Sequence, residues 1–162
     1  MLVAGPFGKP RAEAELRGLF VLAGSDVEAL VATDPAVHAG VLKPELVPFA
    51  SATDLQAVHQ RDLDFERRRK ADPSIPEASG MRSYVALFAG DAARAGSALA
   101  PMREQRRIVL EGRFGGPREG QGLFVIAAAN ADEAHTLLEP LASSLGPHAL
   151  VPWYGSASLA SD

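Results

Sequence analysis

The chain has 162 residues, of which 47% are hydrophobic, with no cysteine and a formal net charge of −4. This length fits one ordinary domain or two small ones that share a core, and the lack of cysteine excludes disulfides, thiolate metal ligands and a cysteine nucleophile. The dense basic run at 67–70 lies among acidic residues, and no stretch approaches the roughly 20 apolar residues of a membrane span, so we expect neither a nucleic-acid partner nor a membrane partner.

The first fifty residues begin with two predicted strands. The opening apolar run, Leu2–Ala4, is too short for a signal peptide, which favours a cytoplasmic protein, and it predicts a strand that ends at Gly5-Pro6. Gly8–Leu16 is predicted to be a polar hairpin loop. Leu19–Ala23 is a continuous apolar run, which is typical of a central strand covered on at least one face.

Helix signals follow in the same region. Asp26 can cap a helix that begins at Val27, because apolar residues then recur at helical spacing. Asp34-Pro35 stops this helix and can start a second short one, with Asp34 as N-cap and Pro35 at the first helical position. Leu46–Ala50 is then expected to close the unit as a strand.

A connector separates this region from the rest of the chain. Asp54–Lys70 contains good helix formers but only an irregular apolar stripe, which predicts a connecting helix with one weakly buried side. Ala71–Gly80 concentrates proline, serine and glycine and is typical of a linker between domains.

The remaining residues predict the order β-α-β-β-α-β, which is the ferredoxin-like order. A helix at Asp91–Gln105 carries Pro101 in its interior, so a break near Ala100 is expected. The glycine-rich stretch between the middle strands lacks the Lys-Ser/Thr of a phosphate loop, which favours a hairpin turn, and the chain after Gly155 is expected to fray. The strands are expected at Ser83–Ala89, Arg107–Phe114, Gly122–Ala128 and Ala149–Trp153, and the second helix at Ala131–Ser144.

The two ends of the chain repeat one another. GLFVLA at 18–23 returns as GLFVIA at 122–127, Asp34-Pro35 returns as Glu139-Pro140, and LVPF at 46–49 returns as LVPW at 150–153. Self-similarity at a long period indicates one structural unit built twice. The first copy supplies only the last four elements, β-β-α-β.

The order of these motifs resembles the YCII-related domain family. The matching segments are LVAGPF at 2–7, the strand at 18–23, ATDPAVHAG at 32–40, ELVPF at 45–49 and, more loosely, residues 82–153. The resemblance implies a ferredoxin-like subunit that pairs sheet to sheet as a dimeric α/β barrel, with a histidine and an aspartate as an acid/base pair beside a cleft. It also implies, for one branch of the family, dehalogenation of a chlorinated hydroquinone. Asp34 matches the family's aspartate.

We therefore predict an α+β fold of tandem ferredoxin-like units, the first lacking its first strand and helix, packed sheet to sheet as a pseudo-dimer that imitates the barrel. The units are expected at 1–50 and 81–155, with a helical connector and linker at 51–80 and a tail at 156–162. Because exposed sheet edges invite association, a homodimer contact or an exchanged element is expected where the first unit lacks its central strand.

Asp34 and His38 are the candidate catalytic residues. Asp34 can be a general base if an apolar cleft raises the pKa of its carboxyl, or it can simply cap the helix that begins at Pro35. His38 follows one helical turn later, where it can pair with Asp34 or lie on an exposed helix face.

Arg17 and Glu139 are the candidate ligand-binding residues. Arg17 begins a predicted strand, so it can face the barrel cleft and bind an anion or point to solvent. Glu139 precedes Pro140 and has the same two interpretations as Asp34, an acid/base group or a cap. The four histidines have no metal-binding spacing, and neither a metal nor another cofactor is predicted.

Two functions from different classes compete. The preferred one is a small-ligand-binding or structural barrel module, because the family's histidine has no counterpart here and Asp34 is replaced by Glu139 in the repeat. The alternative is a small-molecule enzyme that uses Asp34 as acid/base, with hydrolase-like or dehalogenase-like chemistry on a small aromatic. A fold-level resemblance does not by itself decide between them.

Overall fold

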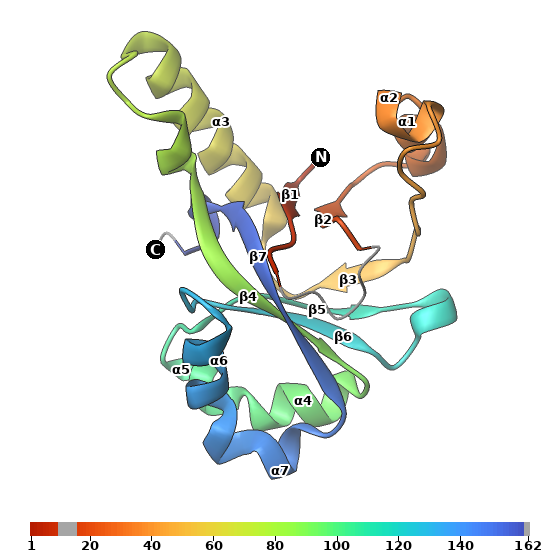
Figure 1. Ribbon diagram of the computed structural model, residues 1–162, viewed down its shortest axis with the longest axis vertical. Coiled ribbons are helices and arrows are strands. Elements are labelled where there is room, and N and C mark those ends of the chain that lie inside the picture. The colour runs from red at the N-terminus through yellow and green to blue at the C-terminus, as the bar shows by residue number, and fades with distance from the viewer. Residues whose placement is uncertain (10–15, 161–162) are drawn as a thin grey trace.

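An antiparallel sheet of five strands lies at the centre of the protein (Figure 1). The computed structural model describes residues 1–9 and 16–160. From one edge to the other, the strands are β3 (Phe49–Ser51), β5 (Ile108–Phe114), β6 (Gly122–Ile126), β4 (Met81–Ala89) and β7 (His148–Ser156). A separate two-stranded sheet consists of β1 (Val3–Pro6) and β2 (Gly18–Val21). The predicted α+β class is therefore confirmed.

The second half of the chain, residues 81–160, has the predicted β-α-β-β-α-β order. Its first strand, β4, lies between β6 and β7, the third and fourth strands, and all neighbours are antiparallel, as in a ferredoxin-like sheet. Between the strands lie α4 (Ala92–Ala98), α5 (Ala100–Glu104), α6 (Ala131–Leu138), the 3-10 turn η3 (Glu139–Leu141) and α7 (Ala142–Leu145). The hairpin turn predicted between β5 and β6 is also confirmed, and it contains η2 (Gly116–Arg118).

Two prolines divide these helices. Pro101 lies in the first turn of α5, so the break expected near Ala100 is confirmed. Pro140 lies in the first turn of η3, and the single helix expected over Ala131–Ser144 is therefore wrong. Proline lacks the N–H that a helix interior needs, and its ring clashes with the preceding turn, so the segment bends at this point.

The four helices of the second half cover one face of the five-stranded sheet (Figure 1). Strand side chains alternate between faces, and one set from β4 and β6 points toward these helices. This half of the core is fully or almost fully buried and contains Val85, Leu87, Phe124, Ile126, Leu99, Leu138 and Leu145.

The opposite face of the sheet is covered by the helix α3 (Leu55–Ala71), by β1 and by the final 3-10 turn η4 (Ala157–Ala160). β1 approaches β7 closely, because the indole N–H of Trp153 donates to the carbonyl oxygen of Gly5 at 3.0 Å. A β-carbon at Gly5 would collide with the backbone carbonyl of Tyr154. The buried residues of this face include Val3, Phe7, Leu55, Val58, Tyr84, Ala86, Trp153 and Leu159.

The described residues form no closed barrel. The first half of the chain, residues 1–50, contributes one two-stranded sheet, and α3 and η4 share the face on which a second full sheet would lie. Leu19–Ala23 was expected to be a central strand, but β1 is the only described strand that pairs with β2, so that prediction is wrong. A two-stranded sheet has no central position.

The closing strand of the first half joins the other sheet. Leu46–Ala50 was expected to complete its own unit, whereas β3 begins at Phe49 and pairs with β5. That prediction is wrong because the first half has no strand to pair with this segment, while the edge of β5 offers free backbone hydrogen-bonding groups. β3 thus extends the sheet of the second half.

The two short helices of the first half begin where the sequence predicted. They are α1 (Val27–Ala32), capped by Asp26, and α2 (Pro35–His38), capped by Asp34. Neither helix has a buried residue, and both stand away from the five-stranded sheet (Figure 1). The predicted hairpin loop at Gly8–Leu16 lies largely outside the described residues.

The connector is confirmed as a helix followed by an irregular segment. Asp54 caps α3, and η1 (Glu77–Gly80) interrupts the Pro- and Ser-rich linker. The fraying expected after Gly155 is wrong for the described residues up to Ala160, because Ser156, Ser158 and Leu159 are buried. The Arg61 guanidinium of α3 also donates to the carbonyl of Ser158 at 2.9 Å. None of the helices in the described part of the chain is long and apolar enough to cross a membrane.

Candidate functional site

Asp34 acts as a helix cap. Its backbone is extended, with φ −65° and ψ 125°, and its Oδ1 accepts hydrogen bonds from the amides of Ala36 at 2.7 Å and Val37 at 3.2 Å. These two amides are among the four that a helix N-terminus leaves without intrahelical partners. The carboxylate is exposed and its oxygen is already engaged, so the capping interpretation accounts for Asp34.

His38 lies at the other end of the same short helix. Its backbone amide donates to the carbonyl oxygen of Asp34 at 2.8 Å, and its side chain is exposed. Within the described residues, no hydrogen bond or ion pair joins the two side chains. The local acid/base pair suggested by the sequence is thus not formed in this arrangement.

Arg17 precedes β2 and is exposed. Its carbonyl oxygen accepts from the amide of Phe7 at 2.9 Å, which closes the hairpin of β1 and β2. Arg17 lines neither of the two cavities described below. The structure therefore gives its backbone a role in the hairpin and leaves its guanidinium at the surface.

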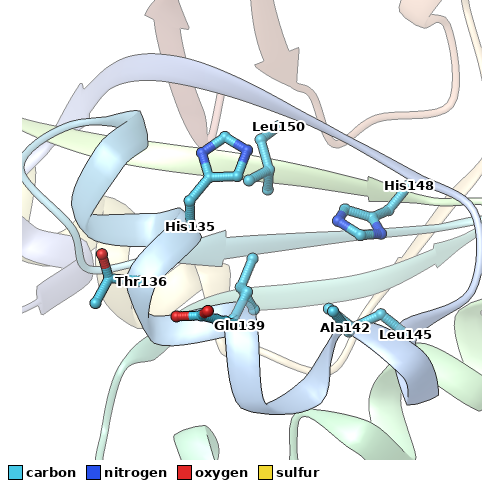
Figure 2. Close-up of a pocket in the computed structure, with 8 residues that line it drawn as sticks. His135, Thr136, Glu139, Ala142, Leu145, His148 and Leu150 are labelled. Carbon is cyan, nitrogen blue, oxygen red and sulfur yellow. The ribbon is translucent and has the colours of Figure 1, made fainter.

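Glu139 lies at the rim of a cavity of about 330 Å³ on the helical face of the second half (Figure 2). This cavity is open to solvent and is lined by residues of α6, η3, α7 and the beginning of β7. Its apolar lining is formed mainly by Leu138, Leu145 and Leu150, of which the first two are buried. The complete set of lining residues is His135, Thr136, Leu138, Glu139, Ala142, Leu145, His148 and Leu150.

Two histidines share this cavity with Glu139. His135 comes from α6 and His148 from β7, and their rings lie on either side of Leu150 in Figure 2. The Nδ1 of His135 lies 2.8 Å from the carbonyl oxygen of Ala131, and the Nδ1 of His148 lies 2.8 Å from that of Gly146. A carbonyl oxygen only accepts, so each Nδ1 carries a proton and donates. The neutral ring then presents Nε2 as an acceptor.

Glu139 is not an N-cap, although it is the C-cap residue of α6. It is the first residue of η3, whose N-cap is Leu138, and no side chain caps that turn, so the capping interpretation of Glu139 is wrong. The preceding helix is capped by Asn130, whose Oδ1 accepts from the amide of Glu133 at 2.9 Å. Among the described residues the Glu139 carboxylate has no hydrogen-bond or ion-pair partner.

A second hollow, of about 510 Å³, lies between α4 and α7 and is lined by Arg94, Ser97, Ala98, Ser143 and Ser144. The Arg94 guanidinium donates to the carbonyls of Ser144 and Ser143, each at 2.8 Å. These bonds satisfy carbonyls at the C-terminal end of α7, as basic side chains often do. The Arg94 guanidinium therefore stabilises the end of α7.

The sequence did not predict that His135 and His148 would line the same cavity, because they lie on different elements of the chain. The repeat gives no signal for them, since neither has a histidine counterpart in the first copy. In the part of the chain that the structure describes, no group of three or more His, Cys, Asp or Glu side chains is placed to hold a metal ion.

The fold and the cavity together define an α+β protein whose second half has a ferredoxin-like strand order and carries a small, largely apolar cavity on its helical face. No family model, curated protein or solved structure matches this chain.

Proposed function

We propose that this protein is a non-catalytic module related to the YCII domain, and that it binds a small ligand in the cavity formed by α6, η3, α7 and β7. The observation that carries this proposal is the lining of the cavity, which combines three leucines with Glu139 and two histidines. Small-molecule sites combine an apolar lining with a few polar groups that orient the ligand. The cavity has that composition.

The second support is the state of Asp34. Its Oδ1 is bound to two amides of α2, and it lines neither described cavity. A general base must reach the proton that it removes, within a hydrogen bond or through one water. A carboxylate that caps an exposed helix is better suited to stabilising that helix.

A cavity-filling variant tests the proposal. Ala142 lines the cavity and is exposed, so Ala142→Phe is expected to fill the space without disturbing the core. Ala93→Phe, on the exposed side of α4, is the matched control. In a screen of small amines, alcohols and carboxylates, ligands of the wild-type chain should also bind Ala93→Phe and lose affinity for Ala142→Phe by tenfold or more. Equal binding to Ala142→Phe would refute this location for the site.

The enzyme alternative has a direct test in Asp34. Asparagine caps a helix about as well as aspartate, so Asp34→Asn should leave stability nearly unchanged, whereas Asp34→Ala should cost about 0.5–2 kcal/mol. Loss of a general acid or base should lower turnover by about 10²–10⁴-fold in both variants. The assay is turnover of small halogenated and hydroxylated aromatics. If Asp34→Asn turns over such a compound at the wild-type rate, Asp34 is a cap and not the catalytic group.

We also propose that two copies of the chain associate through the first half. Five large apolar side chains are exposed among the described residues of this half, namely Met1, Phe20, Leu30, Val41 and Leu46, with exposed fractions of 63%, 60%, 50%, 75% and 40%. Among the described strands β2 has β1 as its one hydrogen-bonded neighbour, so no described strand pairs with its other edge. An open edge beside apolar side chains favours pairing with a second strand.

Light scattering over a range of concentrations tests this association. The wild-type chain is expected to show a dimer at high concentration, and Phe20→Glu is expected to shift it toward the monomer. Leu63→Glu, at an exposed apolar position on α3, is the control and should not change the mass. A wild-type chain that stays monomeric at every concentration would contradict the proposal.

A further inference from the structure

We propose that the first half of the chain is the acceptor for a β-strand that another polypeptide donates. The donated strand is extended and apolar on both faces, and it pairs antiparallel with β2 on one side and with β3 on the other. This inference goes beyond ligand binding in the cavity, because it concerns a different part of the chain.

The strands of the two sheets form one run that ends at β2 and β3 (Figure 1). β1 lies against β7, since Phe7 and Trp153 form an antiparallel bridge and the amide of Gly8 donates to the carbonyl of Pro152 at 2.7 Å. The order is therefore β2, β1, β7, β4, β6, β5 and β3. No described strand pairs with the outer edge of β2 or of β3.

Both end strands border the same core. Leu19 and Val21 of β2 and Phe49 of β3 are partly buried against one cluster of apolar side chains. A strand that paired with β2 and β3 would therefore place one of its faces on this cluster.

The internal repeat shows which strand belongs between them. One offset relates GLFV at 18–21 to 122–125 and LVPF at 46–49 to LVPW at 150–153. In the second half these segments lie on β6 and β7, and β4 lies between β6 and β7 and pairs antiparallel with both. The described residues of the first half contain no counterpart of β4.

Two exposed apolar side chains mark the position of this counterpart. Leu87 of β4 pairs with Phe124 of β6 and with Leu150 of β7. The corresponding residues of the first copy are Phe20 and Leu46, which are 60% and 40% exposed. An apolar residue of the donated strand, at the place of Leu87, would cover both side chains at once.

The helix α1 gives the same indication. Leu30 of α1 and Ala134 of α6 each stand four residues after the cap of their helix. Ala134 is fully buried in the cluster that contains Val85 and Leu87 of β4, whereas Leu30 is 50% exposed. A donated strand would supply the missing part of the surface on which α1 can pack.

The chemistry of the donor follows from β4. Tyr84 and Ala86 of β4 belong to the core on one face of the sheet, and Val85 and Leu87 belong to the core on the other. A strand that is buried on both faces is a continuous apolar run of about 4–8 residues, without proline at its centre. Addition of such an extended segment to an open sheet edge is a known mode of peptide recognition.

A second copy of this chain fits the position less well. Its β4 already pairs with β6 and β7, and association through β2 would leave the edge of β3 unpaired. A donated strand instead satisfies both edges, so it should also compete with the association proposed above.

The test uses the full chain at a concentration where it is monomeric. The probe is a synthetic peptide with the sequence of residues 82–90, RSYVALFAG, followed by lysines for solubility. The matched control is the same peptide with Leu87→Pro, because proline lacks an N–H and interrupts strand pairing. Calorimetric titration should show that the first peptide binds at least about tenfold more tightly than the proline peptide.

Hydrogen exchange shows whether both edges take part. The carbonyl of Arg17 bonds toward β1, so Phe20, three residues later, directs its amide to the outer edge of β2. The carbonyl of Pro152 bonds away from β4, so Val151 faces β4, and Val47 is its counterpart. The bound peptide is expected to slow exchange at the amides of both Phe20 and Val47.

A variant of the chain tests the β3 side. Leu46→Asp should weaken binding of the first peptide by at least about tenfold, since a charge would face its apolar centre. Leu63→Asp, at a position on α3 that is 43% exposed, is the control and should leave binding unchanged.

Three results would overturn the proposal. They are equal or absent binding of the two peptides, protection of Phe20 without Val47, and wild-type affinity in Leu46→Asp. Protection of Phe20 alone would mean that the peptide adds to β2 only, as a second copy would. Each of these results leaves ligand binding in the cavity of the second half untouched.

Discussion

The tetrapeptide GLFV occurs at residues 18–21 and again at 122–125, and the two copies have very different surroundings. In β6 all five residues are buried and the strand lies between β5 and β4. In β2 no residue is buried and β1 is the only hydrogen-bonded neighbour among the described strands. Phe124 is 4% exposed, whereas its counterpart Phe20 is 60% exposed. The same residues form a strand in both places, but burial depends on what lies beside them.

The helices that follow the two strands differ in the same way. α6 buries Ala134 and Leu138 against the sheet, whereas α1 buries no residue. The second half has β4 in the middle of its sheet, and the first half has no equivalent strand. Without that central strand there is no broad apolar surface on which α1 could pack.

The largest expected effect separates the two phenylalanines. Phe124→Ala should lower the free energy of unfolding by about 3–5 kcal/mol, because it removes a buried ring and leaves a cavity. Phe20→Ala should change it by about 0.5 kcal/mol or less, as expected at an exposed position. Urea unfolding of each variant, at a concentration where the chain is monomeric, measures both values. Similar losses in the two variants would mean that β2 is buried in solution.

The next effect concerns Tyr84, which is buried in the second half. Burial raises the pKa of Tyr84 to about 12, and its hydroxyl donates to the carbonyl of Ser156 at 2.8 Å. The folded state keeps the phenol neutral, while the unfolded chain ionises above about pH 10. Stability is therefore retained below pH 10 and lost as pH rises from 10 toward 12, by about 2–3 kcal/mol in total.

Tyr84→Phe is the control for this alkaline loss, because it has no phenol to ionise. It should cost about 0.5–1.5 kcal/mol at pH 8 through the lost hydrogen bond, and the difference from wild type should shrink as pH rises. Urea unfolding at pH 8 and pH 11 gives the comparison. An unchanged difference at the two pH values would place Tyr84 in contact with solvent.

A smaller effect concerns two matched caps. Asp26 and Asn130 stand at the same spacing from the two GLFV segments, and each accepts a hydrogen bond from an amide in the first turn of its helix. Asn130→Ala should lower global stability by about 0.5–2 kcal/mol, because α6 is part of the core. Asp26→Ala should instead leave urea unfolding nearly unchanged and speed hydrogen exchange at the amide of Ala29. Equal global losses would show that α1 is packed after all.

The smallest effect concerns the ion pair between Arg118 and Glu45, which joins the two halves of the chain. Arg118 of η2 makes two hydrogen bonds to the Glu45 carboxylate, at 2.8 and 2.9 Å, and these hold the pKa of Glu45 below its usual value. The contribution is therefore present above the unfolded pKa, near 4.5, and is lost as pH falls through the lower folded value.

Because this pair is partly exposed, it should contribute at most about 1 kcal/mol, and less at high salt. The measurement is the loss of stability between pH 7 and pH 3, which should be smaller in Glu45→Gln than in the wild type. A variant with an acid loss equal to that of the wild type would contradict a role for this pair in joining the halves.

The candidate site was accessible from the sequence only in part. Glu139 was identified because it stands where the repeat has Asp34, but its capping interpretation failed, since the first residue of η3 has no role as a cap there. His135 and His148 gave no signal, because a cavity between a helix and a strand depends on how α6 and β7 pack. Spacing along a chain reveals partners within one helix and not across a sheet.

By itself, the sequence determined the local structure. Caps at Asp26 and Asp34, the break at Pro101 and the strands of the second half follow from the hydrogen-bonding and steric preferences of a few neighbouring residues. Only the tertiary structure decided the pairing partners of β2 and β3, the packing of the chain after Gly155 and the presence of two histidines in one cavity. Those outcomes depend on which backbone edges and apolar faces remain free once the chain has folded. Distant segments compete for these edges and faces, and a short stretch of sequence does not show which segment will pair with them.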